Sequence, residues 1–253
     1  MATTKLDHLT RHCDRLLDIA NIEDWSGAQN GLQVENRGQV KHIAAAVDAS
    51  LATVKLAIAA KADLLIVHHG LFWGPSTPWT GKKYELLKLL LDNNLAVYSS
   101  HLPLDCHPKL GNNARLAAAL GLKKPRSFFF EKGRDIGMKY AARTTRRQLI
   151  KKLEQAVGGP VTVLPGGPTT CRQIGVVTGG AGSQLTKAAA EGVDTFITGE
   201  GPHHTFALAE EVGINVLYAG HYATETFGVK ALSEHLAKKF KLTWEFIDHP
   251  TGL

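Results

Sequence analysis

The chain has 253 residues, 44% of them hydrophobic and 21% charged, and is long enough to bury the core of one large domain or two smaller ones. No stretch approaches the roughly 20 apolar residues of a membrane span, and the charged start lacks the apolar core of a secretory signal. Three widely spaced cysteines argue against a disulfide framework. The cytoplasm is therefore the expected location. The net charge of +6 is mild, and its densest run, Arg143 to Lys152, is typical of a solvated helix face rather than of a nucleic-acid groove.

The first third of the chain predicts a βαβ unit. Leucines at helical spacing predict an amphipathic helix over residues 5–20, and a polar loop follows over 30–39. The apolar run 43–47 predicts a buried strand, after which Ser50 can cap a helix that leads into a second strand, DLLIV. The handed crossover makes these two strands parallel. A loop rich in proline and tryptophan, a helix over 84–94 and a strand over 95–99 are expected next.

Two adjacent histidines, His68 and His69, stand where the DLLIV strand ends. Neighbouring residues of a strand point to opposite faces, so both imidazoles can face one site only if the backbone turns, which Gly70 permits. In open α/β sheets, ligands bind at this end of the strands. The pair is therefore interpreted either as part of a metal centre or as two histidines that are solvated or bonded to the backbone.

Two further strand ends carry a histidine and an acid four residues apart. His101 and Asp105 follow the third strand, where Pro103 predicts a loop, and either residue could be the ligand there. His221 and Glu225 lie where a helix begins, so one helix face can present both. Imidazoles together with carboxylates suit zinc, manganese or iron, whereas calcium prefers oxygen alone. Each residue alone has an ordinary structural explanation, but three such strand ends together favour a metal site.

The sequence also aligns with itself, which indicates an internal duplication. Ile43 falls on Ile174 at an offset of 131 residues (174 − 43), and His101 falls on His221 at an offset of 120 (221 − 101). These matches predict two lobes of similar topology, with residues 1–125 plus 220–253 as the metal-binding lobe and 126–219 as an inserted second lobe.

The second lobe contains a glycine-rich turn, TGGAGS, at residues 178–183. Such a turn can hold phosphate on its backbone N–H groups, but without the lysine of a P-loop it is as typical of a tight connection between a strand and a helix. The last helix is predicted from about Thr224 to Phe240, and LTWEFID (242–248) predicts a closing strand.

The motifs NGLQV, AVDAS, IVHHGLFW, SSHLPLDCHPKLGNNARLAAALG, VDTFITGE and AGHYATETFGVKALSEHL resemble, over almost the whole chain, the YbgI branch of the Nif-three-like family. Members of that family are also called GTP cyclohydrolase I type 2 homologues. The resemblance implies a three-layer α/β/α protein with two similar lobes, assembled as a ring-shaped homohexamer. It also implies two divalent metal ions in each subunit, of the zinc, iron or manganese class.

Carried over residue by residue, the resemblance implies the metal ligands His68, His69, Asp105, His221 and Glu225. It places His101 near the metals, where it would serve catalysis by orienting a ligand or a bound water. His203 and His204 match no family ligand and are expected to face solvent or the ring cavity. Nothing carries over onto residues 126–170, the variable middle segment.

Two functions of different classes follow from these expectations. The first is a metal-dependent hydrolase of a nucleotide or related small molecule. In such an enzyme, hydroxide could open the guanine ring of GTP, and the phosphates could bind to the TGGAGS turn or to the basic run. The second is a non-catalytic metal-binding regulatory, trafficking or scaffold protein. The expected partners are other copies of the chain and a small molecule; no membrane is expected, and nucleic-acid binding is a distant third reading.

Overall fold

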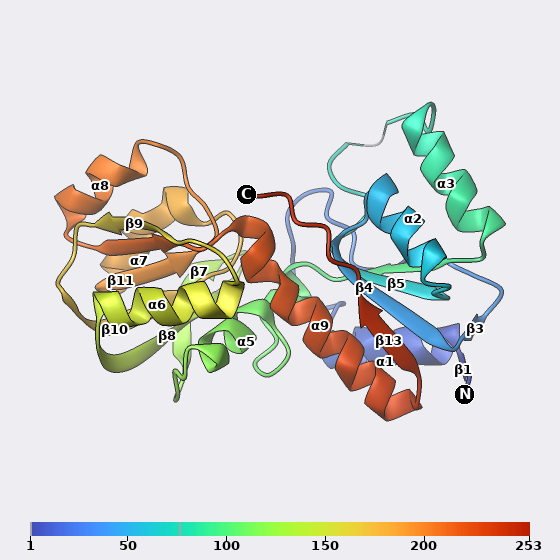
Figure 1. Cartoon of the computed structure of the whole chain (residues 1–253), viewed down its shortest axis with the longest axis horizontal. Coiled ribbons are helices and arrows are strands. Elements are labelled where there is room, and N and C mark those ends of the chain that lie inside the picture. Colours follow the sequence, from blue (N-terminus) through green and yellow to red (C-terminus); the bar gives the residue numbers. More distant parts are fainter. Residues whose placement is uncertain (1, 76) are drawn as a thin grey trace. The chain divides into compact units, whose positions relative to one another are not determined.

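The computed structural model describes residues 2–75 and 77–253 and shows an α/β fold with two compact units (Figure 1). The first unit comprises Met1–His107 and Gly228–His249, and the second comprises Pro108–Phe227 and Pro250–Leu253. The boundary on the N-terminal side thus lies before α5 (Asn112–Ala119), whereas the sequence placed it at residue 125. Leu116, Ala117 and Leu120 explain the difference, because they pack in a core with Tyr140 of the second unit.

A five-stranded sheet forms the centre of the first unit, in the order β13-β4-β5-β6-β2. Its parallel strands are β4 (His42–Asp48), β5 (Leu64–His69), β6 (Ala96–Ser99) and β13 (Thr243–Phe246). The edge strand β2 (Gly31–Val34) is antiparallel to β6. The prediction of a polar loop over 30–39 is wrong for this strand, because pairing with β6 outweighs its polar composition. The first unit also contains a short antiparallel pair, β1 (Thr4–Lys5) and β3 (Gln39–Val40).

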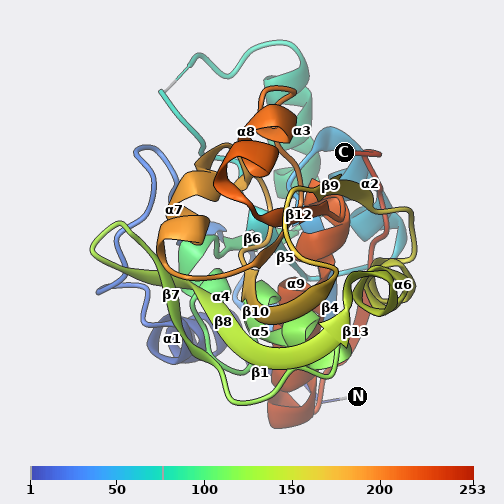
Figure 2. The ribbon, with the colours of Figure 1, turned by 90° about the vertical axis from the view of Figure 1, so that its left-hand side faces the viewer.

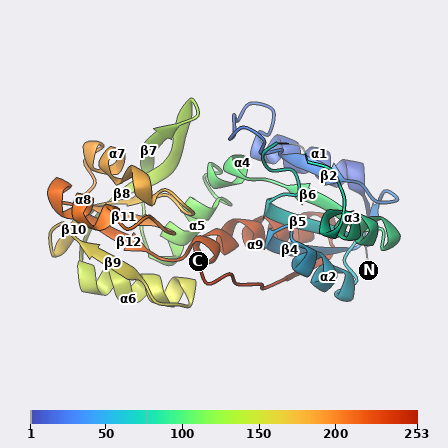
Figure 3. The same cartoon turned by 90° about the horizontal axis from the view of Figure 1, so that it is seen from above.

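Helices cover both faces of this first sheet. On one face α2 (Leu51–Ala59) and α3 (Lys82–Asp92) pack against alternate strand residues, which include Ala44, Ala46, Leu65, Val67 and Val97. On the other face, Tyr98 donates a hydrogen bond to Asp14 of α1 (Leu6–Leu17) at 2.9 Å. Figure 3 shows α1 and α2 on opposite sides of the strands. The predicted cap at Ser50 is confirmed, since its side chain accepts a hydrogen bond from the Thr53 N–H at 3.2 Å.

The second unit has a six-stranded sheet in the order β7-β8-β10-β11-β12-β9. The strands are β7 (Arg126–Glu131), β8 (Arg134–Thr145), β9 (Thr162–Pro165), β10 (Thr170–Val176), β11 (Thr195–Thr198) and β12 (Asn215–Tyr218). α5 and α6 (Arg146–Val157) pack on one face, and α7 (Leu185–Ala190) lies on the other, as Figure 2 shows for α6 and α7. Helix α8 (Thr205–Val212) precedes β12. In the basic run, Arg143 lies in β8 and Arg146 is half-buried, whereas Arg147, Lys151 and Lys152 are exposed on α6, as predicted for a solvated helix face.

The strand orders of the two units match where the sequence repeat predicts it. Three parallel strands followed by an antiparallel edge strand occur as β4-β5-β6-β2 and as β10-β11-β12-β9. Ile43 pairs with Leu64, and Ile174 pairs with Thr195, so the offset of 131 (174 − 43 and 195 − 64) holds across both pairs. Ala96 of β6 pairs with Leu64, and Asn215 of β12 pairs with Thr195, so these two residues are equivalent at an offset of 119 (215 − 96). The offset of 120, which relates His101 to His221, therefore begins only after the strand. The origin of this similarity in a duplication stays a prediction.

Two local predictions are corrected by the structure. Residues Leu102–Asp105 form a helical turn, α4, instead of a loop, because Pro103 lies in the first turn, where its missing N–H is not needed. The last helix, α9 (His221–Phe240), begins three residues before the predicted Thr224, at the histidine itself. Among the described residues, no helix is long and apolar enough to cross a membrane.

Candidate metal centre

The C-terminal ends of the parallel strands in the first unit bring several polar side chains to one edge of the sheet. β5 ends with His68 and His69, the neighbouring β4 ends with Asp48, and β6 is followed by Ser100 and His101. The backbone binds these ends together, since Ser100 N–H donates to the Val67 carbonyl at 3.0 Å. Parallel pairing therefore places the residues that the sequence predicted at one edge.

Three histidines of this edge converge on one point. One ring nitrogen from each of His68, His69 and His101 lies within 4.8 Å of the others. The ring centroid of His68 is 4.9 Å from those of both His69 and His101. Gly70 was predicted to permit a turn of the backbone, but it has no positive φ. The absence of its side chain matters for another reason, because a Cβ there would clash with the side-chain amide of Gln33. Gly70 therefore provides space for Gln33, which accepts a hydrogen bond from the Leu71 N–H at 2.7 Å.

The Nδ1 atom of each of these histidines faces an acceptor. His68 Nδ1 lies 2.9 Å from the carbonyl oxygen of Ser100. His69 Nδ1 lies 2.8 Å from Oδ1 of Asp48, and His101 Nδ1 lies 2.8 Å from Oδ1 of Asp24. Acceptors at Nδ1 select the tautomer with its proton there, so that Nε2 presents a lone pair. Metal-binding histidines are held in this way.

The side chain of Asp24 is only 5% exposed and is strongly hydrogen-bonded. Its Oδ2 accepts from Asn30 at 2.8 Å and from the Leu102 N–H at 3.1 Å. Burial by itself would raise the pKa of Asp24, but hydrogen bonds, first of all with His101, hold the pKa below its ordinary value. Asp24 is therefore an ionised carboxylate that fixes the orientation of His101.

Asp105 comes to the same cluster from helical turn α4. Its Oδ2 lies 3.4 Å from Nε2 of His68, and both residues are buried. We call His68, His69, His101 and Asp105 the first cluster. All four were predicted to belong to the site, and the structure brings them together.

A second cluster lies in the second unit, where β11 and the start of α9 approach each other. We define it as Glu200, His221 and Glu225. His221 Nδ1 lies 2.8 Å from Oε1 of Glu200, and its Nε2 lies 3.2 Å from Oε2 of Glu225. The hydrogen bond with Glu225, and to a lesser degree that with Glu200, raises the pKa of His221 to about 9 despite its burial.

The TGGAGS turn supports this second cluster. Gly179 has φ +73, and a Cβ on it would clash with Oε1 of Glu225. Its N–H donates to Thr224 Oγ1 at 3.1 Å, and its carbonyl accepts from the Gly199 N–H at 2.7 Å. The N–H groups of Thr178, Ala181 and Gly182 also donate within the unit. The turn is therefore a tight connection that makes room for Glu225, and these amides do not serve a phosphate.

Sequence reasoning missed the three carboxylates that accept from histidine Nδ1 atoms: Asp24, Asp48 and Glu200. Asp48 and Glu200 come directly at or after strand ends, so the rule that found His68 also points to them. Asp24 lies in an irregular segment and has no such signal. His203 and His204 are exposed at the start of α8, in line with the expectation that they face solvent.

Comparison with known proteins places the chain in one family. The family model Duf34/NIF3 (NGG1p interacting factor 3) matches residues 4–251. A protein of Deinococcus radiodurans named "GTP cyclohydrolase 1 type 2 homolog" is 40% identical over 252 residues, which cover 98% of this chain and 94% of the relative. The crystal structure of TTHA1606 from Thermus thermophilus matches with a TM-score of 0.91 at 39% identity. A solved structure of protein ybgI matches with a TM-score of 0.91 at 38% identity, and each match covers 99% of this chain and 100% of the other. This chain therefore belongs to the DUF34/NIF3 family, as the resemblance predicted.

Proposed function

We propose that this protein binds divalent metal ions through both clusters and is a metal-dependent hydrolase of a nucleotide or a related small molecule. One observation carries the metal binding: in each cluster an imidazole Nε2 faces a buried carboxylate oxygen. These pairs are His68 with Asp105 at 3.4 Å and His221 with Glu225 at 3.2 Å. An imidazole Nε2 and a carboxylate oxygen both bind divalent metals, and a metal ion bound between them would replace the proton that otherwise joins His221 to Glu225.

Three carboxylates orient histidines of the two clusters in this proposal. Asp48, Asp24 and Glu200 hold the rings of His69, His101 and His221 so that Nε2 points away from them. Because His101 shares the geometry of its two neighbours, we assign it as a further ligand in place of the orienting role expected from the sequence. Bound divalent metals supply Lewis acidity, which lowers the pKa of water to about 7. The shared dinuclear centre implied by the resemblance stays a prediction.

The choice of a nucleotide is supported by the names of the relatives. Relatives about 40% identical are named as homologues of GTP cyclohydrolase 1 type 2. Family membership alone does not carry a substrate over to this chain. GTP is therefore the first compound to test, and hydrolysis of its guanine ring would release formate.

Elemental analysis tests the ligand assignment. Purified protein loaded with zinc, manganese or ferrous iron is expected to hold about two ions per chain, and Asp105→Ala and Glu225→Ala are expected to lose one or both. Asp92→Ala and Glu234→Ala are matched controls, because these exposed carboxylates pair with lysines one helical turn away and lie outside both clusters. Metal content that is unchanged in the first two variants would refute the assigned ligands.

Turnover of a nucleotide panel tests the hydrolase. Metal-loaded protein is expected to convert GTP or another member of the panel, with formate and nucleotide products measured by chromatography, and metal-free protein and Asp105→Ala are expected to be inactive. Absence of turnover with both clusters filled would remove the hydrolase and leave the alternative, a non-catalytic metal-binding protein.

A further inference from the structure

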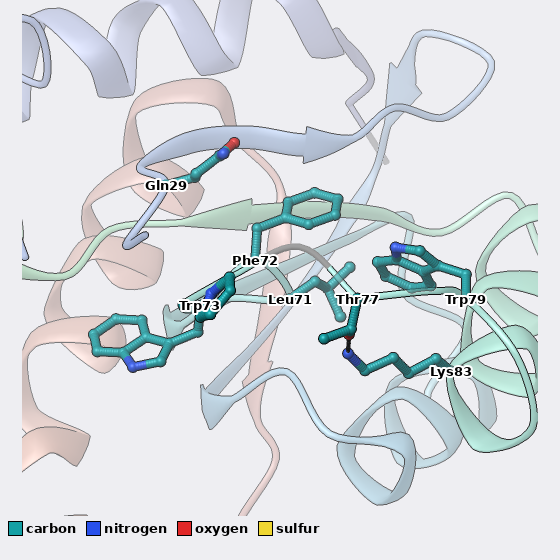
Figure 4. Close-up of a pocket in the computed structure, with 9 residues that line it drawn as sticks. Gln29, Leu71, Phe72, Trp73, Thr77, Trp79 and Lys83 are labelled. Atoms are coloured by element: carbon teal, nitrogen blue, oxygen red, sulfur yellow. Dashed lines mark hydrogen bonds between the residues drawn. The ribbon is translucent and has the colours of Figure 1, made fainter. Parts of the chain in front are cut away.

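A pocket opens in the first unit directly beside the first cluster. It has a volume of about 170 Å³ and is formed by the loop that follows His69 and by the start of α3. The side chains that carry the inference are shown in Figure 4: Leu71, Phe72, Trp73, Thr77, Trp79 and Lys83. At this size the pocket suits one ring system rather than a complete drug-sized ligand, for which pockets of about 300 Å³ or more are typical.

Three aromatic side chains are among the residues that line the pocket: Phe72, Trp73 and Trp79. The rings of Phe72 and Trp79 lie 5.6 Å apart at 63°, with Leu71 beneath them. Such surfaces offer a planar ligand ring both stacking and edge contacts. The wall therefore favours an aromatic ligand.

Trp73 joins this pocket to the first cluster. Its ring lies 4.8 Å from that of His101 at 90° and 5.8 Å from that of His69. The same side chain is 50% exposed and lines the pocket, and Figure 4 shows its indole pointing away from Phe72 and Trp79. Trp73 therefore connects the loop that lines the pocket to the side chains that are proposed to hold metal.

Lys83 gives the pocket a positive charge. Its ammonium group donates to the hydroxyl of Thr77, and among the described residues no carboxylate pairs with it. The neighbouring Lys82 differs, since it pairs with Glu85 at 2.8 Å, as does Lys55. Because the charge of Lys83 is balanced by no acid in the pocket, the pocket favours an anionic group on the ligand.

We propose that this pocket binds a planar heteroaromatic ring with an anionic substituent, as in a nucleotide. The ring contacts Trp79 and Phe72, and the anion pairs with Lys83. This inference rests on the proposed function for its biological meaning, because it makes the pocket the place where the hydrolase would recognise its substrate. The binding itself requires no metal, so the two proposals can fail separately.

The experiment is calorimetric titration of metal-free protein with GMP, AMP and UMP and with the corresponding nucleosides. Trp79→Ala is expected to weaken binding of the nucleotide and its nucleoside about tenfold or more, and Trp79→Phe is expected to restore most of it. Lys83→Ala is expected to weaken binding of the nucleotide alone. Lys82→Ala and Tyr84→Ala, neighbours on α3 that do not line the pocket, are expected to bind as the wild type does.

The outcomes separate the two proposals. Wild-type protein that binds none of these probes, or Trp79→Ala and Lys83→Ala that bind them normally, would overturn the pocket assignment. Binding that depends on Trp79 and Lys83 without any turnover of the metal-loaded protein would support the pocket and overturn the hydrolase. Turnover with a KM that neither substitution changes would support the hydrolase and overturn the pocket.

Discussion

The imidazoles of both clusters are oriented by acceptors that lie behind them. Asp48, Asp24, Glu200 and the carbonyl of Ser100 each face an Nδ1 atom at 2.8 to 2.9 Å. Four histidines held in the same way in two clusters are unusual for solvated side chains, which have no need of a fixed tautomer. Replacing an acceptor should therefore change metal affinity without removing any ligand.

Asp48→Asn tests this at His69. The amide keeps the size of the carboxylate but loses its charge, so the proton on Nδ1 of His69 and the orientation of the ring are less firmly fixed. Metal affinity, measured by competition with a chelator, is expected to fall about 10- to 100-fold. Asp92→Asn, an exposed carboxylate on α3, is the matched control. An unchanged affinity in Asp48→Asn would contradict the role assigned to Asp48.

Gly179 provides a second test at the residue scale. Gly179→Ala and Gly158→Ala both place alanine at φ +73, so both should lower the free energy of unfolding by about 1 kcal/mol or more. Only at Gly179 would the new methyl group meet Glu225, while nothing lies within 4 Å of one at Gly158. Metal affinity is expected to fall in Gly179→Ala and to be unchanged in Gly158→Ala, by the same chelator competition. Equal affinities would show that Glu225 does not bind metal.

The residues of the clusters could be predicted to different extents. His68, His69, His101 and Asp105 were found because buried parallel strands deliver their C-terminal residues to one edge. Asp24 could not be found in this way, because it reaches His101 from a loop 77 positions earlier in the chain, and no periodicity marks that loop.

At the scale of elements, a histidine pair joins α1 to α9 within the first unit. Nε2 of His12 lies 3.3 Å from Nε2 of His235, and the rings are nearly parallel, at 15°. Burial, followed by the positive charge of Lys239, lowers the pKa of both histidines below 6.5. Protonation of both would set two N–H groups against each other, so the folded state favours the neutral pair.

This pair predicts stability that falls in acid. Because the folded pKa values are below the unfolded value of about 6.5, the contribution is complete above pH 6.5 and is lost as the pH falls from there through the folded values. The melting temperature of His12→Gln and of His235→Gln is expected to fall less than that of the wild type between pH 7.5 and pH 5.5. His204→Gln, at the exposed start of α8, should follow the wild type. Parallel curves for all four proteins would contradict the prediction.

The elements that the sequence predicted well are those with a strong apolar period. The helix at α1 and the buried strands β4 and β5 agree with the prediction within a few residues. β2 was missed because an edge strand with only one buried residue has little hydrophobic signal. α4 was missed because Pro103 was interpreted as breaking a helix, although proline is well tolerated in the first turn.

At the scale of the whole molecule, the repeat and two lobes were visible in the sequence, but the unit to which α5 belongs was not. The parallel strands β4 and β5 pair in the same register as β10 and β11, which an offset can detect. The placement of α5 depends on tertiary packing of Leu116 and Leu120, whose amphipathic pattern would suit either core. Sequence patterns indicate which faces are buried without naming the partner that buries them.

Assembly is the last prediction at this scale. We propose, from the resemblance, that the chain forms a homohexamer. Two large side chains at the surface of the first unit could contact another copy of the chain: Leu91 is 61% exposed and Tyr84 is 58% exposed, seven residues apart on α3. Light scattering coupled to size-exclusion chromatography is expected to give about 164 kDa, six times the chain mass of 27.3 kDa. A metal-free sample separates assembly from metal binding, since contacts between apolar side chains should persist after chelation. A mass of one chain at micromolar concentration, with or without metal, would rule out the hexamer and would leave each chain to bind metal and substrate alone.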